Sequence, residues 1–554
     1  MSERRTRVRF APSPTGPLHM GGVRTALYNY LYAKQRGGDF ILRIEDTDSH
    51  RFVPGAEQYI IEALDWCGIV PDEGLERTPE GGWKVAEEKS AANPHAPYRQ
   101  SQRRGIYRKY AEQLVADGFA YYAFDSAEEL DERRKSAEAA GETFIYNQKT
   151  RLELRNSLTL PAEETERLLR ETTDWTIRFK MPENTVVKMD DLIRGHIEMN
   201  TDTLDDKVLW KRADELPTYH LANIVDDHLM EITEVIRGEE WLPSLPLHYQ
   251  LYEAFGWTDT MPRFAHLSLL LKPVGNGKLS KRDGDKMGFP VFPLQWVSAD
   301  GTTSHGYRED GYFPEAFVNM LALLGWNPGD DRELFTMEEL IQAFSMEKVQ
   351  KAGAKFNPEK AKWFNKEYLR LKSDGELTDL FLPVLSKHGI TGVDRDYALK
   401  VVSLIKERAS FVEDFWTIAS YLFIAPSQFE AYGVKAGAAI AQKPADPRAK
   451  VYDDSLTAPF LAKDAEKFWN ADNAAAALET VRSLEGKTFP DAHAVSEAVE
   501  SYIKEHEWPM GKVMNCLRLA LTGSASGLGI GDIIYLIGVS EALERLAFAT
   551  RRLG

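Results

Sequence analysis

Two short motifs carry the residue types that bind a polyphosphate. The first is HMGG at residues 19–22, inside the longer string PSPTGPLHMGG. Its glycines, together with Gly16, let a phosphate approach the backbone closely, and His19 can donate a hydrogen bond to a phosphate oxygen. The same string could be only a helix start, so HMGG alone does not establish a nucleotide site.

The second motif is KLSKR at residues 278–282, which places Lys278, Lys281 and Arg282 around one serine. Glycines flank it on both sides, which is typical of a mobile loop. Such a loop is either a solvated run of charge or a clamp in which Lys281 neutralises the charge that develops on leaving pyrophosphate. The ordered pair of motifs favours an ATP site assembled from two distant parts of the chain.

The residues around the first motif predict the elements that position it. TRVRFAPSPTGPL (6–18) predicts a short extended run and a turn, residues 19–35 predict a helix, and FILRIE (40–45) predicts a second strand. Strand, turn, helix and strand in this order open a parallel α/β fold. A helix that follows a glycine-rich turn also points free N–H groups at an anion.

The middle of the chain interrupts this pattern twice. Residues 123–175 are highly charged and sparsely apolar, which indicates an inserted module. Within it, Ser126 and Glu129 form a capping box for a helix that runs to about residue 140. Residues 284–312 are rich in glycine and poor in helix formers, which predicts a long loop or an inserted hairpin.

The C-terminal part reads as helical. Helical spacing begins near residue 314 and is strongest over residues 397–422, which predict one amphipathic helix. Pro444 and Pro447 indicate a linker, and residues 458–554 predict further helices.

The composition fits a globular protein of several domains. At roughly 150 residues per domain, a chain of 554 residues predicts three or four domains. No apolar run is long enough to span a membrane, and the N-terminus lacks the apolar segment of a secretory signal, so we expect a cytoplasmic location and no membrane partner. Cys67 and Cys516 lie too far apart to form a Cys-x-x-Cys pair and are expected to be small buried side chains.

The net charge of −17 means that any RNA-binding surface must be a local basic patch. No DNA partner is expected. The densest basic cluster in the first half of the chain consists of Arg99, Arg103, Arg104, Arg108 and Lys109.

Both motifs resemble the signatures of class I aminoacyl-tRNA synthetases, since HMGG is similar to the HIGH motif and KLSKR to the KMSKS motif. The HIGH motif ends in histidine, whereas Gly22 stands at that position here. Glutamate enzymes of this family commonly carry glycine there. Neighbouring strings narrow the resemblance to the bacterial type of glutamyl-tRNA synthetase. These strings are RFAPSPTGPLHMGGVRTALYNYL (9–31), LRIEDTD (42–48), YRQSQR (98–103), LPTYHLANIVDDHLMEITEVIRGEEWL (216–242) and KLSKRDG (278–284).

The resemblance implies that L-glutamate and ATP form a glutamyl-adenylate. A ribose hydroxyl of the 3′-terminal adenosine of tRNA(Glu) then takes the glutamyl group. Because a carboxylate is already a nucleophile, the first step depends on positioning and charge stabilisation rather than on a general base. Enzymes of this family generally require bound tRNA before they activate glutamate, so we expect the same here.

The resemblance also implies a glutamate pocket. Arg9 and Arg237 match the family's carboxylate-binding arginines, whose planar forks meet a carboxylate in two hydrogen bonds. Glu45 matches the residue that faces the ammonium group. Singly, these side chains could form structural ion pairs, and Tyr219 could belong to the core, but together they match the charges of one ligand. The whole predicted set is Arg9, Ser13, Glu45, Tyr219, Asn223 and Arg237.

For ATP, the resemblance implies a site that holds Mg²⁺ together with the nucleotide. Trp241 is expected near the ATP, although it could be an ordinary core tryptophan. The predicted ATP-binding residues are Thr15, Gly16, His19, Gly22, Trp241 and Lys281, and the predicted catalytic residues are His19, Lys278 and Lys281. The run Asp226–His228 either lines this site or braces it, with bracing favoured.

The tRNA side of the prediction rests on fewer residues. Arg408 falls on the apolar face of the helix expected at 397–422, where it could reach an anticodon base or extend its charged end to the helix rim. The predicted architecture is a Rossmann-like catalytic domain with an inserted acceptor-stem module, followed by an all-helical anticodon-binding region. The expected segments are 1–99 and 223–283 (catalytic), 100–222 (acceptor-stem module), 284–350 (insertion and stem contact), 351–440 and 441–554 (anticodon-binding subdomains).

Two features depart from the family pattern. Some relatives carry a cysteine-rich zinc site in the acceptor module, but residues 100–222 contain no cysteine, so no zinc is predicted. In many relatives KLSKR runs almost directly into a string like YREDGYFPEAF, which here starts only at Tyr307. The extra segment, at about residues 284–306, is either a neutral surface insertion or a regulator of the ATP clamp.

Three rival functions predict different sequences. A glutaminyl-tRNA synthetase would carry an all-β anticodon-binding part, which the helical spacing argues against. The truncated relative that glutamylates a tRNA base would lack residues 330–554. A non-catalytic RNA-binding paralogue would show eroded motifs, whereas His19, Lys278 and Lys281 are all present.

Overall fold

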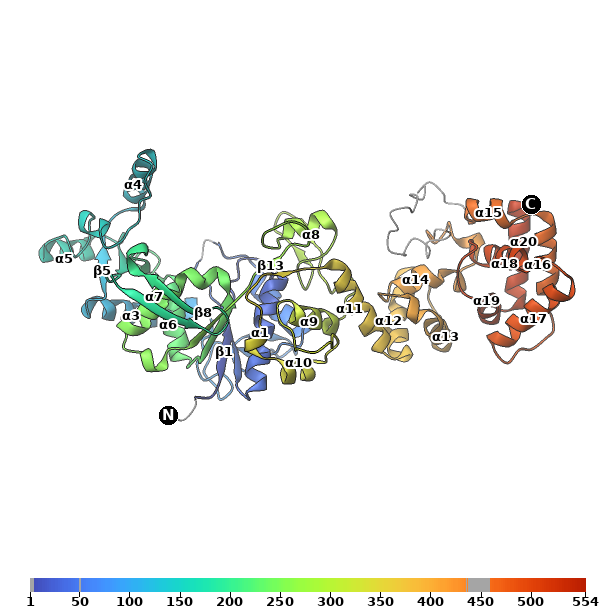
Figure 1. Ribbon diagram of the computed structural model, residues 1–554, viewed down its shortest axis with the longest axis horizontal. Helices are drawn as coiled ribbons and strands as arrows, with labels where there is room; N and C mark the ends of the chain where they lie inside the picture. The colour runs from blue at the N-terminus through green and yellow to red at the C-terminus, as the bar shows by residue number, and fades with distance from the viewer. Residues whose placement is uncertain (1–3, 49–50, 435, 437–458) are drawn as a thin grey trace. The chain divides into compact units, whose positions relative to one another are not determined.

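The computed structural model describes residues 4–48, 51–434, 436 and 459–554, and its chain forms two compact units, Met1–Phe364 and Asn365–Gly554 (Figure 1).

A parallel strand–helix–strand unit opens the first compact unit. Strand β1 (Arg7–Phe10) pairs in parallel with β2 (Asp39–Leu42), and helix α1 (Met20–Gln35) connects them. The α/β opening predicted from the sequence is therefore confirmed. The carboxyl ends of β1 and β2 lie at one edge, so the loop that carries HMGG and the chain that carries Glu45 start from the same edge.

The second half of the catalytic unit supplies a four-stranded sheet in the order β11-β12-β7-β8. Strands β11 (Glu234–Gly238), β12 (Arg263–Leu267) and β7 (Val186–Asp191) are parallel, and β8 (Gly195–Asn200) pairs antiparallel with β7. Helices α6 (Tyr219–Leu229) and α7 (Leu245–Ala254) belong to this half. A backbone hydrogen bond of 2.8 Å from Thr233 to Arg7 ties the start of β11 to β1.

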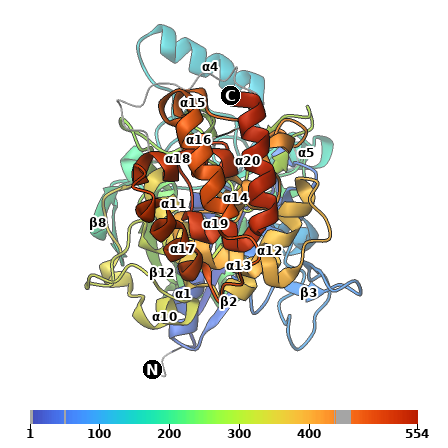
Figure 2. The ribbon, with the colours of Figure 1, turned by 90° about the vertical axis from the view of Figure 1, so that its right-hand side faces the viewer.

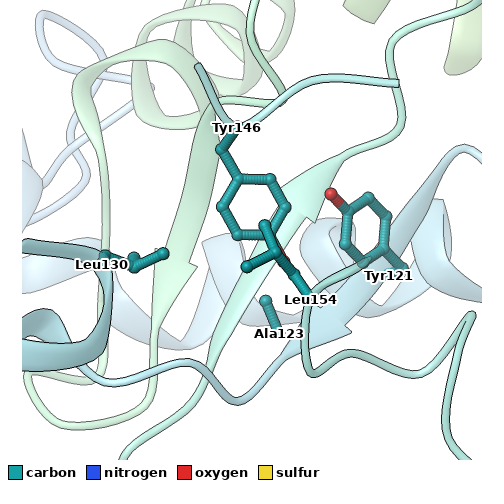
Figure 3. Packing of buried hydrophobic residues seen from close by; sticks show 5 residues of the cluster. All are labelled: Tyr121, Ala123, Leu130, Tyr146 and Leu154. Atoms are coloured by element: carbon teal, nitrogen blue, oxygen red, sulfur yellow. The ribbon is translucent and has the colours of Figure 1, made fainter. Parts of the chain in front are cut away.

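The inserted module is a separate four-stranded antiparallel sheet in the order β10-β9-β6-β5. Its strands are β5 (Ala120–Ala123), β6 (Thr176–Phe179), β9 (Val208–Lys211) and β10 (Leu216–Pro217), and its helices are α3 (Arg104–Ala116), α4 (Ala127–Ala139) and α5 (Ala162–Glu171). The predicted capping box starts α4, and the Ser126 hydroxyl accepts a hydrogen bond from the backbone N–H of Glu129. Figure 3 shows one core cluster of this module, in which Tyr121, Ala123, Leu130, Tyr146 and Leu154 pack together.

The hairpin β7–β8 falls inside the range expected for the acceptor module, yet it pairs with β12 of the catalytic sheet through Phe264 and Asp191. Two smaller elements complete the front of the chain: helix α2 (Ala56–Trp66) and the hairpin of β3 (Leu75–Arg77) and β4 (Trp83–Val85).

After the sheet that contains β12, the segment around KLSKR includes regular elements. Strand β13 (Leu270–Leu271) precedes it, and helix α8 (Lys281–Met287) begins inside the motif. The predicted hairpin is confirmed as β14 (Trp296–Val297) and β15 (Thr303–Ser304). Helices α9 (Pro314–Leu323), α10 (Met337–Ala343) and α11 (Pro358–Leu371) follow, with β16 (Ala354–Lys355) pairing with β13.

The second compact unit is helical over the residues described for it, and its core is a set of helices that includes α16, α18 and α20 (Figure 2). The single helix predicted over residues 397–422 is wrong, because it divides into α13 and α14. The Asp414 carboxylate accepts the backbone N–H groups of Ser410 and Phe411, at 2.8 and 2.9 Å, which holds the chain in a turn at the break. The helices are α12 (Asp374–Lys387), α13 (Arg395–Ile405), α14 (Asp414–Ala419), α15 (Ala462–Phe468), α16 (Ala471–Arg482), α17 (Ala492–Glu505), α18 (Met510–Thr522), α19 (Ile530–Ile537) and α20 (Val539–Leu553).

Three further expectations from the sequence concern the linker, the cysteines and membrane-spanning helices. Pro444 and Pro447, predicted as a linker, lie outside the described residues. Cys67 and Cys516 are both free and buried, as expected. No helix among the described residues is both long and apolar enough to cross a membrane.

Candidate active site

A cavity of about 500 Å³ lies where HMGG begins α1. Four predicted ATP-binding residues line it: Thr15, Gly16, His19 and Gly22. Gly16 has a φ of 148°, a conformation that side chains disfavour, so a glycine is required at this turn. The first motif and the turn before it therefore form one wall of a nucleotide-sized cavity, at the N-terminus of a helix.

His19 is the N-cap of α1 and holds its ring in a defined state. Its Nδ1 accepts the backbone N–H of Gly21 at 3.1 Å, which leaves the proton of a neutral ring on Nε2. Burial, together with the nearby charge of Lys278, lowers the pKa of His19 to about 4, so the ring is neutral at physiological pH. Nε2 is buried and has no hydrogen-bond partner in the part of the chain that is described. The ring therefore carries a donor available to an incoming phosphate oxygen.

The two lysines of KLSKR occupy different places. Lys278 lines the nucleotide cavity, and its Nζ lies 3.5 Å from Oε1 of Glu240 on the same wall. Lys281 is the first residue of α8 and is not among the residues that line this cavity. Lys281 therefore stays a prediction as an ATP-binding residue, and it directly follows Ser280, whose capping box with Asp283 starts α8.

A second cavity, of about 310 Å³, brings together all six residues predicted to bind glutamate: Arg9, Ser13, Glu45, Tyr219, Asn223 and Arg237. It shares Ser13, Thr15, Gly22 and Glu240 with the nucleotide cavity, so the two cavities adjoin. A carboxylate bound in one would lie beside a phosphate bound in the other. This adjacency is the requirement for forming an acyl-phosphate bond.

Arg9 and Glu45 are held by a buried ionic network. Arg9 donates to both carboxylate oxygens of Asp227, at 2.9 and 3.3 Å. Arg43 donates to Asp227 at 2.8 Å and to Glu45 at 3.1 Å, and Asn223 donates to the same Glu45 oxygen at 3.3 Å. Burial raises the pKa of Glu45, whereas Arg9 and Arg43 outweigh burial at Asp227 and hold its pKa below the ordinary value.

Arg237 is held by neutral partners instead. Its Nε donates to Nε2 of His266 at 3.0 Å, and its Nη1 donates to the Tyr219 hydroxyl at 2.9 Å and to Nδ1 of His248 at 3.3 Å. The pKa values of both histidines are lowered, mainly by burial. Within the described chain, no carboxylate forms an ion pair with Arg237.

One arginine of this pocket is not paired with a carboxylate. Arg9 and Arg43 form ion pairs with Asp227 and Glu45, whereas the hydrogen-bond partners of Arg237 are neutral. Arg237 therefore offers an unpaired positive charge to a ligand that carries a carboxylate.

Trp241, predicted to lie near the ATP, is not among the residues that line the nucleotide cavity. It lines the glutamate cavity rather than the nucleotide cavity, and its ring stacks on Tyr219 with centroids 4.1 Å apart. The reason is local, because the 3₁₀ turn Glu239–Ser244 carries it over Tyr219 at the start of α6. At 38% exposure it is not a core tryptophan either. It also lines a third cavity, of about 600 Å³, which extends past Tyr219 to Lys211 and Asp214 of the inserted module.

Two members of the run Asp226–His228, Asp226 and Asp227, brace the site, which is the alternative favoured from the sequence. Asp226 accepts from Gln100, Arg103 and Tyr107 at 3.0, 2.8 and 2.7 Å, which ties α6 to the start of the inserted module. His228 stacks instead on Trp257, with centroids 3.7 Å apart.

The predicted basic cluster is not a continuous RNA-binding surface. Arg103 is buried against Asp226, Arg99 is paired with Glu57 and Glu87, and Arg108 is paired with Glu112. Arg104 and Lys109 remain exposed. The cluster was visible in the sequence, but the sequence did not show that α2, α6 and the loop before α3 supply carboxylates to Arg99 and Arg103.

Several residues of the site were not identified from the sequence. Arg43 lies inside the LRIEDTD string, two residues before Glu45, but nothing in the sequence showed that it is completely buried. His266 and Asp191 gave no signal, because they lie on β12 and β7 and meet only when those strands pair. Nδ1 of His266 lies 2.6 Å from Oδ2 of Asp191, so Asp191 holds the proton of the ring away from Arg237.

Models of known protein families match both parts of the chain. Residues 5–363 match the model of the catalytic domain of class I tRNA synthetases of the glutamate and glutamine type. Residues 376–550 match the model of an anticodon-binding domain.

Similar proteins match over the full length. The chain is 52% identical to a glutamate–tRNA ligase of Porphyromonas gingivalis and 50% identical to one of Flavobacterium psychrophilum, covering at least 98% of both chains in each case. Among solved structures, a glutamate tRNA ligase of Elizabethkingia meningosepticum in complex with its amino acid superposes with a TM-score of 0.88 at 48% identity, covering 100% of both chains. From the matched domains and the identity along the whole chain, we conclude that this protein belongs to the glutamate–tRNA ligase family of class I tRNA synthetases.

Proposed function

We propose that this chain uses ATP to attach L-glutamate to tRNA(Glu). The observation that carries the proposal is the adjacency of the two cavities, one with a free histidine donor at a helix N-terminus and one with an unbalanced arginine. Charging of a transfer RNA also requires an RNA-binding part, for which residues 376–550 are the candidate.

The glutamate site consists of the six side chains of the smaller cavity. Arg237 is the main anchor for one carboxylate, because its charge is uncompensated and its fork is oriented by Tyr219 and His266. Arg9 supplies the second cation. Glu45, with Ser13 nearby, receives the ammonium group.

In the activation step, a glutamate carboxylate oxygen attacks the α-phosphorus of ATP. A bond forms between that oxygen and phosphorus, and the bond to pyrophosphate breaks. His19 donates its Nε2 proton in a hydrogen bond to a phosphate oxygen without transferring it, which matches a ring that stays neutral. Lys278 contributes a positive charge from within the cavity. Lys281, two residues after Leu279 of the cavity wall, would reach the leaving pyrophosphate after a movement of α8.

Mg²⁺ is expected to enter with ATP. Glu240 lines the nucleotide cavity, and a carboxylate combined with phosphate oxygens is the ligand set that Mg²⁺ prefers. When bound, the ion neutralises phosphate charge. Zinc is not part of the proposal, because the inserted module has no cysteine to hold it.

For the tRNA, the third cavity is the candidate site of the 3′-terminal adenosine, since it shares Ser13, Thr15, Glu45, Tyr219 and Trp241 with one or both of the other cavities. Arg408 remains a candidate anticodon contact. It is exposed, and one of its nitrogens donates to the carbonyl of Gly527 at 3.1 Å, which orients the guanidinium and leaves further donors.

The decisive experiment is aminoacylation of tRNA(Glu) and tRNA(Gln) transcripts side by side, with labelled glutamate and labelled glutamine. The proposal requires glutamate to be attached to tRNA(Glu). Attachment of glutamine would refute it, and charging of both transcripts with glutamate would extend it to tRNA(Gln).

A further inference from the structure

The segment after KLSKR, at about residues 284–306, is buried where it meets HMGG. Val291, Phe292 and Leu294 are 3%, 7% and 1% exposed. A neutral surface insertion would leave such side chains in solvent. We call residues 289–294 the strap, because they connect α8 to HMGG and to α2.

The strap contacts HMGG directly. The carbonyl of Val291 accepts the backbone N–H of Met20 at 2.8 Å, which satisfies one of the free donors at the start of α1. The ring of Phe292 meets the ring of His19 edge to face, with centroids 6.1 Å apart and planes at 81°. Phe292 also lines the nucleotide cavity. The histidine that carries the phosphate donor is therefore packed against the insertion.

The other end of the strap is packed against the ATP clamp. Gly284 is the buried residue of α8, and its carbonyl accepts the N–H of Phe289 at 3.2 Å. A side chain at residue 284 would start 2.7 Å from the Phe289 carbonyl oxygen and 2.9 Å from Val291, so α8 lies in close contact with the strap.

Contacts on the outer side of the strap fix its position. The Tyr59 hydroxyl of α2 donates to the carbonyl of Leu294 at 2.5 Å and accepts its N–H at 3.1 Å. The Tyr59 ring also packs against Trp296, with centroids 5.4 Å apart. The backbone of Tyr307 donates to the carbonyl of Phe292 at 3.0 Å. Each of these bonds restrains the strap without involving the nucleotide cavity.

We propose that the strap is a positioning element for ATP, which holds the His19 ring through Phe292 and couples the place of α8 to that of α1. This inference rests on the proposed function, because it concerns the ATP that is consumed in glutamate activation. Phe292 is a positioning residue that acts through His19. The insertion would then determine the position that KLSKR takes, relative to HMGG, when it closes on the nucleotide.

The test compares kinetic constants for two substrates of one reaction, measured as pyrophosphate exchange in the presence of tRNA. Phe292→Ala should lower kcat/KM for ATP on the order of 10- to 100-fold, because small misplacements of a catalytic group carry costs of that size. The KM for glutamate should change less than about twofold. Tyr59→Phe, which removes only the anchoring hydroxyl, should shift the ATP constants in the same direction by a smaller factor. Phe292→Tyr, which keeps the ring, should restore most of the loss.

Two controls separate positioning from a general loss of fold. Val297→Ala truncates an exposed side chain of the same insertion, 55% exposed on β14, and should leave both constants unchanged. In a His19→Ala background, Phe292→Ala should cost much less than it does alone, because two residues that act as a unit are not additive.

Full additivity of the two substitutions would overturn the inference, as would equal loss of ATP and glutamate constants in Phe292→Ala. Absence of exchange in the unaltered protein with tRNA present would instead refute the proposed function, so the two failures are distinguishable.

Discussion

Nε of Arg237 donates to Nε2 of His266 across 3.0 Å, and the opposite nitrogen of the same ring faces Asp191 across 2.6 Å. This relay fixes the tautomer of His266, so that an acceptor rather than a second donor faces the arginine. Arg237 is the arginine of this pocket whose hydrogen-bond partners are neutral. The orientation of this proposed glutamate anchor therefore depends on two residues that do not line the cavity.

Replacing His266 should weaken glutamate binding selectively. His266→Ala removes a hydrogen bond to a charged group, which is worth roughly 1.5–3 kcal/mol, or about a 10- to 150-fold rise in the KM for glutamate. The KM for ATP should change little. The matched control is His228→Ala, since His228 also packs on an aromatic ring but lies at Trp257. A rise of equal size in both KM values would contradict the positioning role.

The same relay predicts how glutamate binding depends on pH. A protonated His266 could not accept from Arg237, and burial lowers the pKa of His266 although Asp191 raises it. The KM for glutamate should therefore stay flat as pH falls through about 6.5, the ordinary pKa of histidine, and should rise only below that range. The check is a KM–pH profile for glutamate, with the profile for ATP beside it. A rise centred near pH 6.5 would show that His266 titrates normally.

The two lysines of KLSKR should differ in their kinetic effects. Lys278 already lines the nucleotide cavity, so Lys278→Ala should raise the KM for ATP as well as lower kcat. Lys281 lies outside it, so Lys281→Ala should lower the rate of activation much more than it changes the binding of either substrate. Lys286→Ala, an exposed change in the same helix, is the control. The measurement is pyrophosphate exchange at varied ATP and glutamate, and equal losses in rate and in glutamate binding would exclude the role given to Lys281.

The residues that line the two cavities were easier to predict from the sequence than the residues that support them. His19, the glycines and the six residues of the smaller cavity lie in long strings whose spacing matches one family. Arg43 and the His266–Asp191 pair could not be predicted, since their roles arise from strand pairing between distant segments.

Hydrogen bonds between a side chain and the backbone, which compete with helical hydrogen bonds, explain the error in secondary structure. Residues 397–422 keep helical spacing throughout, yet Asp414 accepts two backbone N–H groups and stabilises a turn that periodicity does not reveal. In the same way, the basic cluster near residue 103 could be counted from the sequence, whereas its neutralisation by Asp226 depends on the fold.

Arg103 should therefore contribute to stability rather than to RNA binding. Arg103→Gln removes the closer cation of the buried Asp226 and leaves Arg43, whose Nε lies 3.9 Å away, so the free energy of unfolding should fall by about 3 kcal/mol, the lower end of the range for a broken buried pair. Arg104→Gln, an exposed neighbour, should change it by less than about 0.5 kcal/mol. The measurement is denaturant unfolding of the two variants, together with tRNA affinity. A large loss of tRNA affinity in Arg103→Gln at unchanged stability would reverse this assignment.

Glutamate activation should require tRNA, and the third cavity suggests why. Tyr219 and Trp241 form a stacked wall between that cavity and the glutamate pocket, so a terminal adenosine bound on one side would press on the pocket from the other. Pyrophosphate exchange should be near background without RNA and should appear with intact tRNA(Glu), but not with tRNA(Glu) that lacks its terminal adenosine. Trp241→Ala should weaken this dependence, because it removes one layer of the wall. Strong exchange without RNA in the unaltered protein would show that the pocket is complete by itself and that the wall only separates two sites.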